Sequence, residues 1–274
     1  MTKKKLLPYF LLSGALLLVL LIYLAPKVPK TVSQVVPELT SSSTIEEIID
    51  REKKDLPDST LTKITFLEQD VAASPHPDST YRFLSELWLK HQKPGIAAFY
   101  NERLAQLMQS ADEYVTAGDI YLQASNAIQE NDESNYWMER AGAAFEEANR
   151  MNPGDPAIMT RLGTYYTEAT QEPMKGITLL REVLNKNPDF VDAHLQLGLF
   201  SIKSGQYDKA IERFNFVINS DTSKIDAYLY LAESYRFMQK KDSAIIFAKK
   251  FKEANADPMM ERQVDFYIKE LQSN

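Results

Sequence analysis

The sequence predicts an all-α protein in which antiparallel helix pairs stack in chain order. Three observations support this fold class. Ala, Leu, Glu, Lys and Gln, which favour helices, are abundant in the 274 residues. Glycine occurs only 9 times, and alternating β-branched runs of the kind that form strands are scarce. The C-terminal half repeats itself with a period of 34 residues, a length that fits one helix–turn–helix unit.

The N-terminus carries a charge-free run from Leu6 to Pro26. Its 21 residues would form a helix about 30 Å long, enough to cross the hydrocarbon core of a bilayer. A cleaved signal peptide would have a shorter apolar region and a small-x-small cleavage site, whereas this run ends in "IYLAPKVPK". We therefore predict a basic tail over residues 1–5, an uncleaved transmembrane signal anchor over 6–26 and a flexible Pro/Ser/Thr-rich linker over 27–42.

The lysines around this run predict its orientation. Lys3, Lys4 and Lys5 precede the run, and two lysines follow it. The positive-inside rule then places the N-terminus in the cytoplasm and the body outside, which in a bacterium is the periplasm. An anchored receptor that faces the cytosol is the alternative.

The repeat becomes visible when residues 191–224 are aligned with residues 225–258. Both segments carry small residues where two helices would cross closely, and larger apolar residues around them. Each pair of helices is too small to bury its own apolar face, so stacking on the next pair closes the core. The matching positions are Asp192/Asp226, Ala193/Ala227, Leu195/Leu229, Leu197/Leu231, Gly198/Ala232, Asp208/Asp242, Ala210/Ala244 and Ile211/Ile245.

This pattern resembles the tetratricopeptide repeat, whose 34-residue units have Leu-Gly or Leu-Ala in the first helix, then Ala and Phe in the second, and often a closing Pro. The resemblance covers three units, at 156–190, 191–224 and 225–258, the first with one extra residue near "TQEPM". A divergent unit over 110–155 fits only with a longer loop around "ENDESN". The resemblance implies a right-handed superhelical solenoid that binds proteins.

The segments on either side of these units fit the repeat less well. Residues 43–109 are predicted to be helical and repeat-like, with Ala98 and Ala105 spaced seven apart as in the second helix of a unit. Residues 259–274 are predicted to form a capping helix with a polar outer face, as terminal repeats require.

No catalytic or cofactor motif is present in the sequence. Nucleotide-binding, metalloprotease and serine-hydrolase signatures are missing, cysteine is absent, and the three histidines are far apart. Residues 31–274 hold 26 basic and 38 acidic residues, a net charge of −12 that disfavours nucleic acid as a partner. We predict no enzyme activity, cofactor or metal. The alternative is an enzyme or an accessory region of one at residues 43–155.

The resemblance also implies a binding site on the first helices of the units, which line a concave groove in this family. We predict that this groove holds an apolar or amphipathic segment of a partner protein, or else that its leucines pack only against their own neighbours. A lysine and asparagine clamp for a carboxylate is not expected, because leucines and a glutamate stand in those positions. The predicted groove residues are Asp192, Leu195, Leu199, Ile202, Lys203, Asp226, Leu229, Glu233, Arg236 and Phe237.

Overall fold

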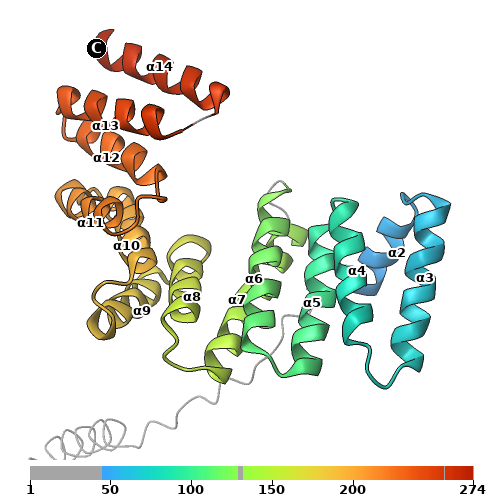
Figure 1. Cartoon of the computed structure of the whole chain (residues 1–274). Helices are drawn as coiled ribbons and strands as arrows, with labels where there is room; N and C mark the ends of the chain where they lie inside the picture. Colours follow the sequence, from blue (N-terminus) through green and yellow to red (C-terminus); the bar gives the residue numbers. More distant parts are fainter. Residues whose placement is uncertain (1–44, 129–131, 256, 274) are drawn as a thin grey trace, which may run out of the picture. The chain divides into compact units, whose positions relative to one another are not determined.

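The computed structural model describes residues 45–128, 132–255 and 257–273, and these form thirteen helices with no strand among them (Figure 1). The predicted basic tail, membrane anchor and linker lie outside the described residues. None of the helices that the structure does describe combines the length and apolarity needed to cross a bilayer.

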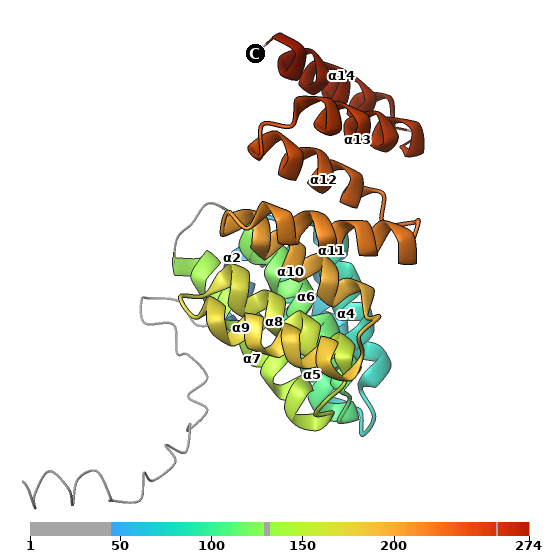
Figure 2. The ribbon, with the colours of Figure 1, turned by 90° about the vertical axis from the view of Figure 1, so that its left-hand side faces the viewer.

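The helices from α4 onward come in antiparallel pairs, and the second helix of each pair packs against the first helix of the next. Figures 1 and 2 show α12, α13 and α14 side by side in that order. The helices are α2 (Ile45–Lys53), α3 (Asp58–Ala73), α4 (Asp78–Lys90), α5 (Pro94–Met108), α6 (Ala111–Asn126), α7 (Asp132–Met151), α8 (Pro156–Ala169), α9 (Pro173–Lys186), α10 (Val191–Lys203), α11 (Tyr207–Ser220), α12 (Asp226–Phe237), α13 (Lys241–Ala254) and α14 (Pro258–Ser273).

Three of the turns inside pairs share one backbone geometry. The middle residue of the turn has a positive φ in each case: 58° at Gln92, 72° at Gly205 and 59° at Gln239. Only at Gly205 does the residue type match this conformation without steric cost. The shared geometry fixes which positions of α4 and α5 correspond to those of α10 and α11. Counted from this turn, the α4/α5 unit begins at Asp78.

This register differs by one residue from the spacing seen in the sequence. Ala97 and Leu104 lie at the positions of Ala210 and Val217, whereas Ala98 and Ala105 lie one residue further along α5. All four of the α5 residues are fully buried. The adjacent alanines explain why the sequence alone could not choose between the two registers.

The helices of a pair cross where a glycine meets a large side chain. A Cβ atom on Gly198 would lie 2.6 Å from the ring of Phe214, and one on Gly118 would lie 2.5 Å from the ring of Phe145. Such distances are too short for real contacts, so only glycine allows the helices to approach this closely. In the α12/α13 pair both positions are alanines, Ala232 and Ala248, and both are fully buried.

The pair α6/α7 has extra residues both between its helices and within them. Five residues separate α6 from α7, against three between α10 and α11, as the predicted longer loop requires. Helix α7 begins at Asp132, within "ENDESN", and runs for 20 residues. Ser125 near the end of α6 and Ser134 near the start of α7 lie 3.1 Å apart between their hydroxyl oxygens, and both are buried. The added turns therefore extend the contact between the two helices.

Polar contacts hold α5, α6 and α7 together. Glu102 forms an ion pair with Arg140, and both side chains are only 13% exposed. The Tyr121 hydroxyl donates a hydrogen bond of 2.8 Å to the same carboxylate. Burial and the negative charge of Glu102 raise the pKa of Tyr121 well above its ordinary value. The network thus ties one pair, α4/α5, to the next, α6/α7.

The first helix, α2, lies over the turns of later pairs. Glu52 forms ion pairs with Lys93, in the turn between α4 and α5, and with its neighbour Arg51. Arg51 also reaches Glu133 at the start of α7, at 2.9 Å. Burial raises the pKa of Glu52, but hydrogen bonds from Lys93 and Arg51 outweigh it and hold the pKa below its ordinary value.

The last helix, α14, packs on α13 through Val264 and Ile268, which are buried with Phe251. The prediction of a polar outer face is wrong at two positions. Phe266 is 71% exposed and Met259 is 63% exposed, so this end of the stack presents apolar side chains to solvent.

Candidate functional site

The predicted groove residues lie on α10 and α12, and the structure divides them into two groups. Leu195, Leu199 and Ile202 are half-buried and pack on the apolar cluster that α11 and α12 share. Leu229 packs in the same way on the cluster formed with α13 and α14. Much of the apolar surface of these four side chains therefore contacts neighbouring units. For the leucines, this is the packing described by the alternative to partner binding.

The charged groove residues mostly pair within the chain. Asp192 accepts a bond of 2.7 Å from Lys224, and Lys203 lies 3.4 Å from Glu168 of the preceding unit. Glu233 pairs with Arg236, and hydrogen bonds from Arg236 hold the pKa of Glu233 below its ordinary value. These pairs are partly exposed, so each holds its partner only weakly.

Phe237 is the most exposed apolar residue of the predicted groove, at 43%. Its ring stacks on Tyr207 of the preceding pair, with 4.9 Å between the ring centres and 9° between their planes. The Arg236 guanidinium lies 4.5 Å above the centre of the Phe237 ring. Tyr207, Phe237 and Arg236 therefore form one stacked group of side chains between α11 and α12.

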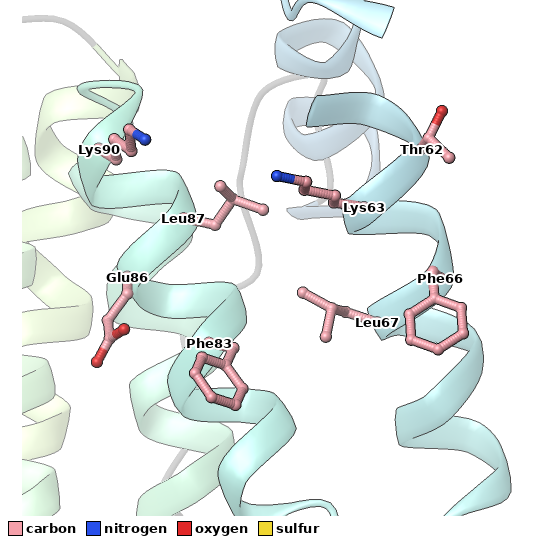
Figure 3. Close-up of a pocket in the computed structure, with 8 residues that line it drawn as sticks. All are labelled: Thr62, Lys63, Phe66, Leu67, Phe83, Glu86, Leu87 and Lys90. Atoms are coloured by element: carbon pink, nitrogen blue, oxygen red, sulfur yellow. The ribbon is translucent and has the colours of Figure 1, made fainter. Parts of the chain in front are cut away.

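A second candidate surface lies between α3 and α4, where no site is predicted from the sequence (Figure 3). It is an open hollow of about 590 Å³ with a largely apolar lining. Phe66 on α3 is 67% exposed and Phe83 on α4 is 59% exposed. Large apolar residues with such exposure are uncommon as a group on a monomer and mark interaction surfaces. The lining residues are Thr62, Lys63, Phe66, Leu67, Phe83, Glu86, Leu87 and Lys90.

The charged residues of this hollow differ from those of the predicted groove. In the part of the chain that the structure describes, Lys63, Glu86 and Lys90 make no ion pair within 4 Å and no side-chain hydrogen bond. Figure 3 places Lys63 and Lys90 toward one end of the hollow, with Phe66 and Phe83 toward the other. The hollow thus combines an apolar wall with two lysines available to a ligand.

The sequence contained one sign of this surface. Helix α4 carries apolar residues around more than half of its circumference, including Tyr81, Phe83, Leu84, Leu87 and Leu89. Leu84 is fully buried against α5, but a helix that is apolar on several faces needs more than one apolar neighbour. Helix α3 covers the remaining face of α4 incompletely.

His194 and the two tryptophans pack against other side chains. His194 stacks on Phe216, with 4.0 Å between the ring centres, and Trp88 and Trp137 are buried. Within the described ranges, no three His, Asp or Glu side chains gather closely enough to hold a metal ion.

Comparison with known proteins supports the repeat. Two segments match models of the tetratricopeptide repeat, at residues 179–212 and 226–257. The first match spans the second half of α9, α10 and the start of α11, and the second spans α12 and α13. A search of curated proteins found no match.

Several solved structures are similar to this chain. PilW, described as a widely conserved type IV pilus biogenesis factor, has a TM-score of 0.57 at 15% identity, over 73% of this chain and 88% of PilW. The APC/C hetero-tetramer Cut9–Hcn1 has a TM-score of 0.54 at 13% identity, over 76% of this chain and 39% of the matched chain. YrrB, a TPR protein with an unusual peptide-binding site, reaches a TM-score of 0.45 at 19% identity, over 74% and 97% of the two chains. The described helices form a solenoid of the tetratricopeptide-repeat type, and two segments of its C-terminal half carry the repeat in their sequence.

Proposed function

We propose that this protein is a membrane-anchored scaffold that recruits a partner protein through its helical repeats. The observation that carries the proposal is the repeat solenoid, whose first helices carry the predicted groove residues. Stacked helix pairs expose a long surface suited to a peptide or a helix. The anchor is proposed from the charge-free run over 6–26, with the body on the extracytoplasmic side and a role in assembling or maturing an envelope complex.

We infer from their burial which of the groove residues would contact the partner. Because Leu195, Leu199 and Leu229 are half-buried in the chain's own packing, first contact would fall to exposed groups nearby. Phe237 is an exposed aromatic side chain, and Lys203 and Arg236 are exposed and positively charged. We propose a partner segment with an apolar side chain flanked by an acidic one.

A site-specific crosslinking experiment tests this function. A photoreactive amino acid is placed in the full-length chain, in cells, at Lys203 or at Phe237. The control position is Ile246 on the second helix α13, which is 54% exposed and is not a predicted groove residue. We expect adducts to the same protein from both groove positions and none from the control. Equal capture at all three positions, or no adduct from either groove position, would contradict a groove-based scaffold.

A further inference from the structure

The hollow between α3 and α4 lies where the regular repeat would place a helix. Counting back 34 residues from the α4/α5 pair puts Lys63 at the position of Ala97 and Leu67 at that of Asn101. In the later pairs these positions face the first helix of the same pair: Phe214, which corresponds to Asn101, packs against Gly198. Helix α3 is therefore a second helix, and the hollow is the place of its missing first helix.

Helix α2 does not fill this place. Its ion pairs with Lys93 and Glu133 lie at the turns of the next two pairs, and Lys53 near its end pairs with Glu68 of α3 at 2.7 Å. Among the residues that the structure describes, α3 consequently has no first helix against its Lys63 and Leu67 face. The hollow is the result.

Helix α14 is the counterpart of α3: it is a first helix that has no second helix among the described residues. Counting forward 34 residues from α12 puts Phe266 at the position of Ala232, and hence of Gly198. Val264 and Ile268 correspond in the same way to Tyr230 and Ser234, and Tyr230 contacts Phe214 of the preceding second helix. Val264 and Ile268 accordingly pack against α13. Helix α14 thus sits as a first helix, and its exposed Phe266 occupies the position that meets a second helix in the other pairs. A phenylalanine ring there would hold the two helices further apart than they are at the Gly198/Phe214 crossing.

The geometry points to one occupant for the hollow: we propose that α14 of a second copy of this chain docks between α3 and α4. The copies would then associate head to tail, and each junction would complete a helix pair from α14 of one copy and α3 of the next. The contact is heterologous, because the two surfaces lie at opposite ends of the chain's helix order.

The exposed apolar area agrees with this pairing. The hollow carries the positive charge of Lys63 and Lys90, whereas the acids Glu261 and Asp265 of α14 already pair with Lys252 of α13. Docking would also cover the exposed rings of Phe66, Phe83 and Phe266, which no other described part of the chain covers.

Disulfide crosslinking tests the contact directly, because the natural chain has no cysteine. Two differently tagged full-length copies are co-expressed, one with Leu67→Cys and the other with Phe266→Cys, and the cells are treated with a mild thiol oxidant. We expect a covalent dimer that carries both tags. Replacing Phe266→Cys by Ile246→Cys, a comparably exposed position on α13, should abolish it. Absence of the mixed dimer, or an equal yield with Ile246→Cys, would overturn the proposal.

Complementation of two blocked copies tests the head-to-tail sense. Phe83→Glu blocks the hollow and Phe266→Glu blocks the helix, and both side chains are exposed enough for the fold to tolerate the charge. By analytical ultracentrifugation of the full-length chain in detergent, each variant alone should be monomeric, and an equal mixture should form dimers and nothing larger. The unaltered chain should form larger species as its concentration rises.

Other results would contradict the proposal. A monomeric unaltered chain at all concentrations would do so, and so would dimers of Phe266→Glu alone, because these would show a symmetric contact through the hollow. Circular dichroism of both variants, expected to match the unaltered chain, separates loss of association from loss of fold.

Discussion

The pair α4/α5 and the pairs α6–α13 solve the same packing problem with different side chains. In α6–α13 the helices cross on small apolar residues, as where Gly118 meets Phe145, Gly198 meets Phe214 and Ala232 faces Ala248. In α4/α5 polar groups enter the crossing: Asn101 donates a hydrogen bond of 2.6 Å to Ser85, at the positions of Phe214 and Gly198. Glu102 of α5 adds a largely buried ion pair with Arg140 of α7.

The difference teaches how far the repeat can depart from its pattern and keep its backbone. A glycine against a large ring sets a close approach by shape alone. A hydrogen-bonded pair sets the approach by geometry, and it must remain complete, since a buried polar group without its partner costs free energy. In α4/α5 the polar solution keeps the helix pair but replaces residues of the repeat signature, and both family matches lie after residue 178.

The largest expected effect is on the ion pair of the polar region. Arg140→Ala leaves the Glu102 carboxylate buried without its cation, and we expect a loss of about 3 kcal/mol in the free energy of unfolding. The double variant Glu102→Leu/Arg140→Leu should recover much of this loss, because it removes both charges. Urea unfolding followed by circular dichroism measures both. A single variant that is as stable as the unaltered chain would show that the network does not hold α5 to α7.

A smaller effect is expected at the closest crossing of the apolar region. A Cβ atom on Gly176 of α9 would overlap the carbonyl oxygen of Gly163 on α8, which is backbone and cannot rotate away. Gly176→Ala should therefore cost about 2 kcal/mol through overpacking, although alanine has the higher helix propensity.

The matched comparison for Gly176 is Ala210→Gly, the reverse change at the corresponding position of α10/α11. It should cost only about 1 kcal/mol, mainly the lower helix propensity of glycine. Thermal unfolding of the two variants gives their order. If Gly176→Ala proves neutral or stabilising, the helix pair α8/α9 must relax more easily than the crossing suggests.

The smallest net effect is expected when a glycine–phenylalanine crossing replaces the hydrogen-bonded Ser85–Asn101 pair of α4/α5. Asn101→Phe alone should destabilise α4/α5, because the ring meets Ser85 and leaves its hydroxyl without a partner. Adding Ser85→Gly installs the glycine–phenylalanine crossing and should recover about 1 kcal/mol or more of that loss. A double-mutant cycle by chemical unfolding measures the coupling. Additive effects of the two changes would mean that Ser85 and Asn101 do not correspond to Gly198 and Phe214.

The sequence was sufficient for the helical class and for the repeat units after residue 156. These follow from local periodicity and from residue types that seldom serve another purpose. The alignment of α4/α5 was shifted by one residue because Ala97 and Ala98 are equally small. The exposure of Leu195 and Leu199 depends on how neighbouring pairs pack, which a single unit cannot show.

The hollow between α3 and α4 could not be predicted from the sequence, for a different reason. Its existence depends on α2 lying elsewhere. Ile48 and Ile49 of α2 are buried in the same cluster as Trp88 and Trp137, and its ion pairs with Lys93 and Glu133 join residues that are 41 and 82 positions apart. Charge pairs at such separations leave no periodic trace in a sequence. The exposed rings of Phe66 and Phe83 then read as ordinary core residues.

The placement of α2 also has a mechanical consequence. A pull applied at Ile45 would reach the solenoid through the buried side chains of Ile48 and Ile49 and through the α2 ion pairs to Lys93 and Glu133. Such a load would act on contacts with two helix pairs at once, whereas a pull on α3 alone would load one helix at the end of the stack. Helix α2 would therefore spread a pulling force over two helix pairs.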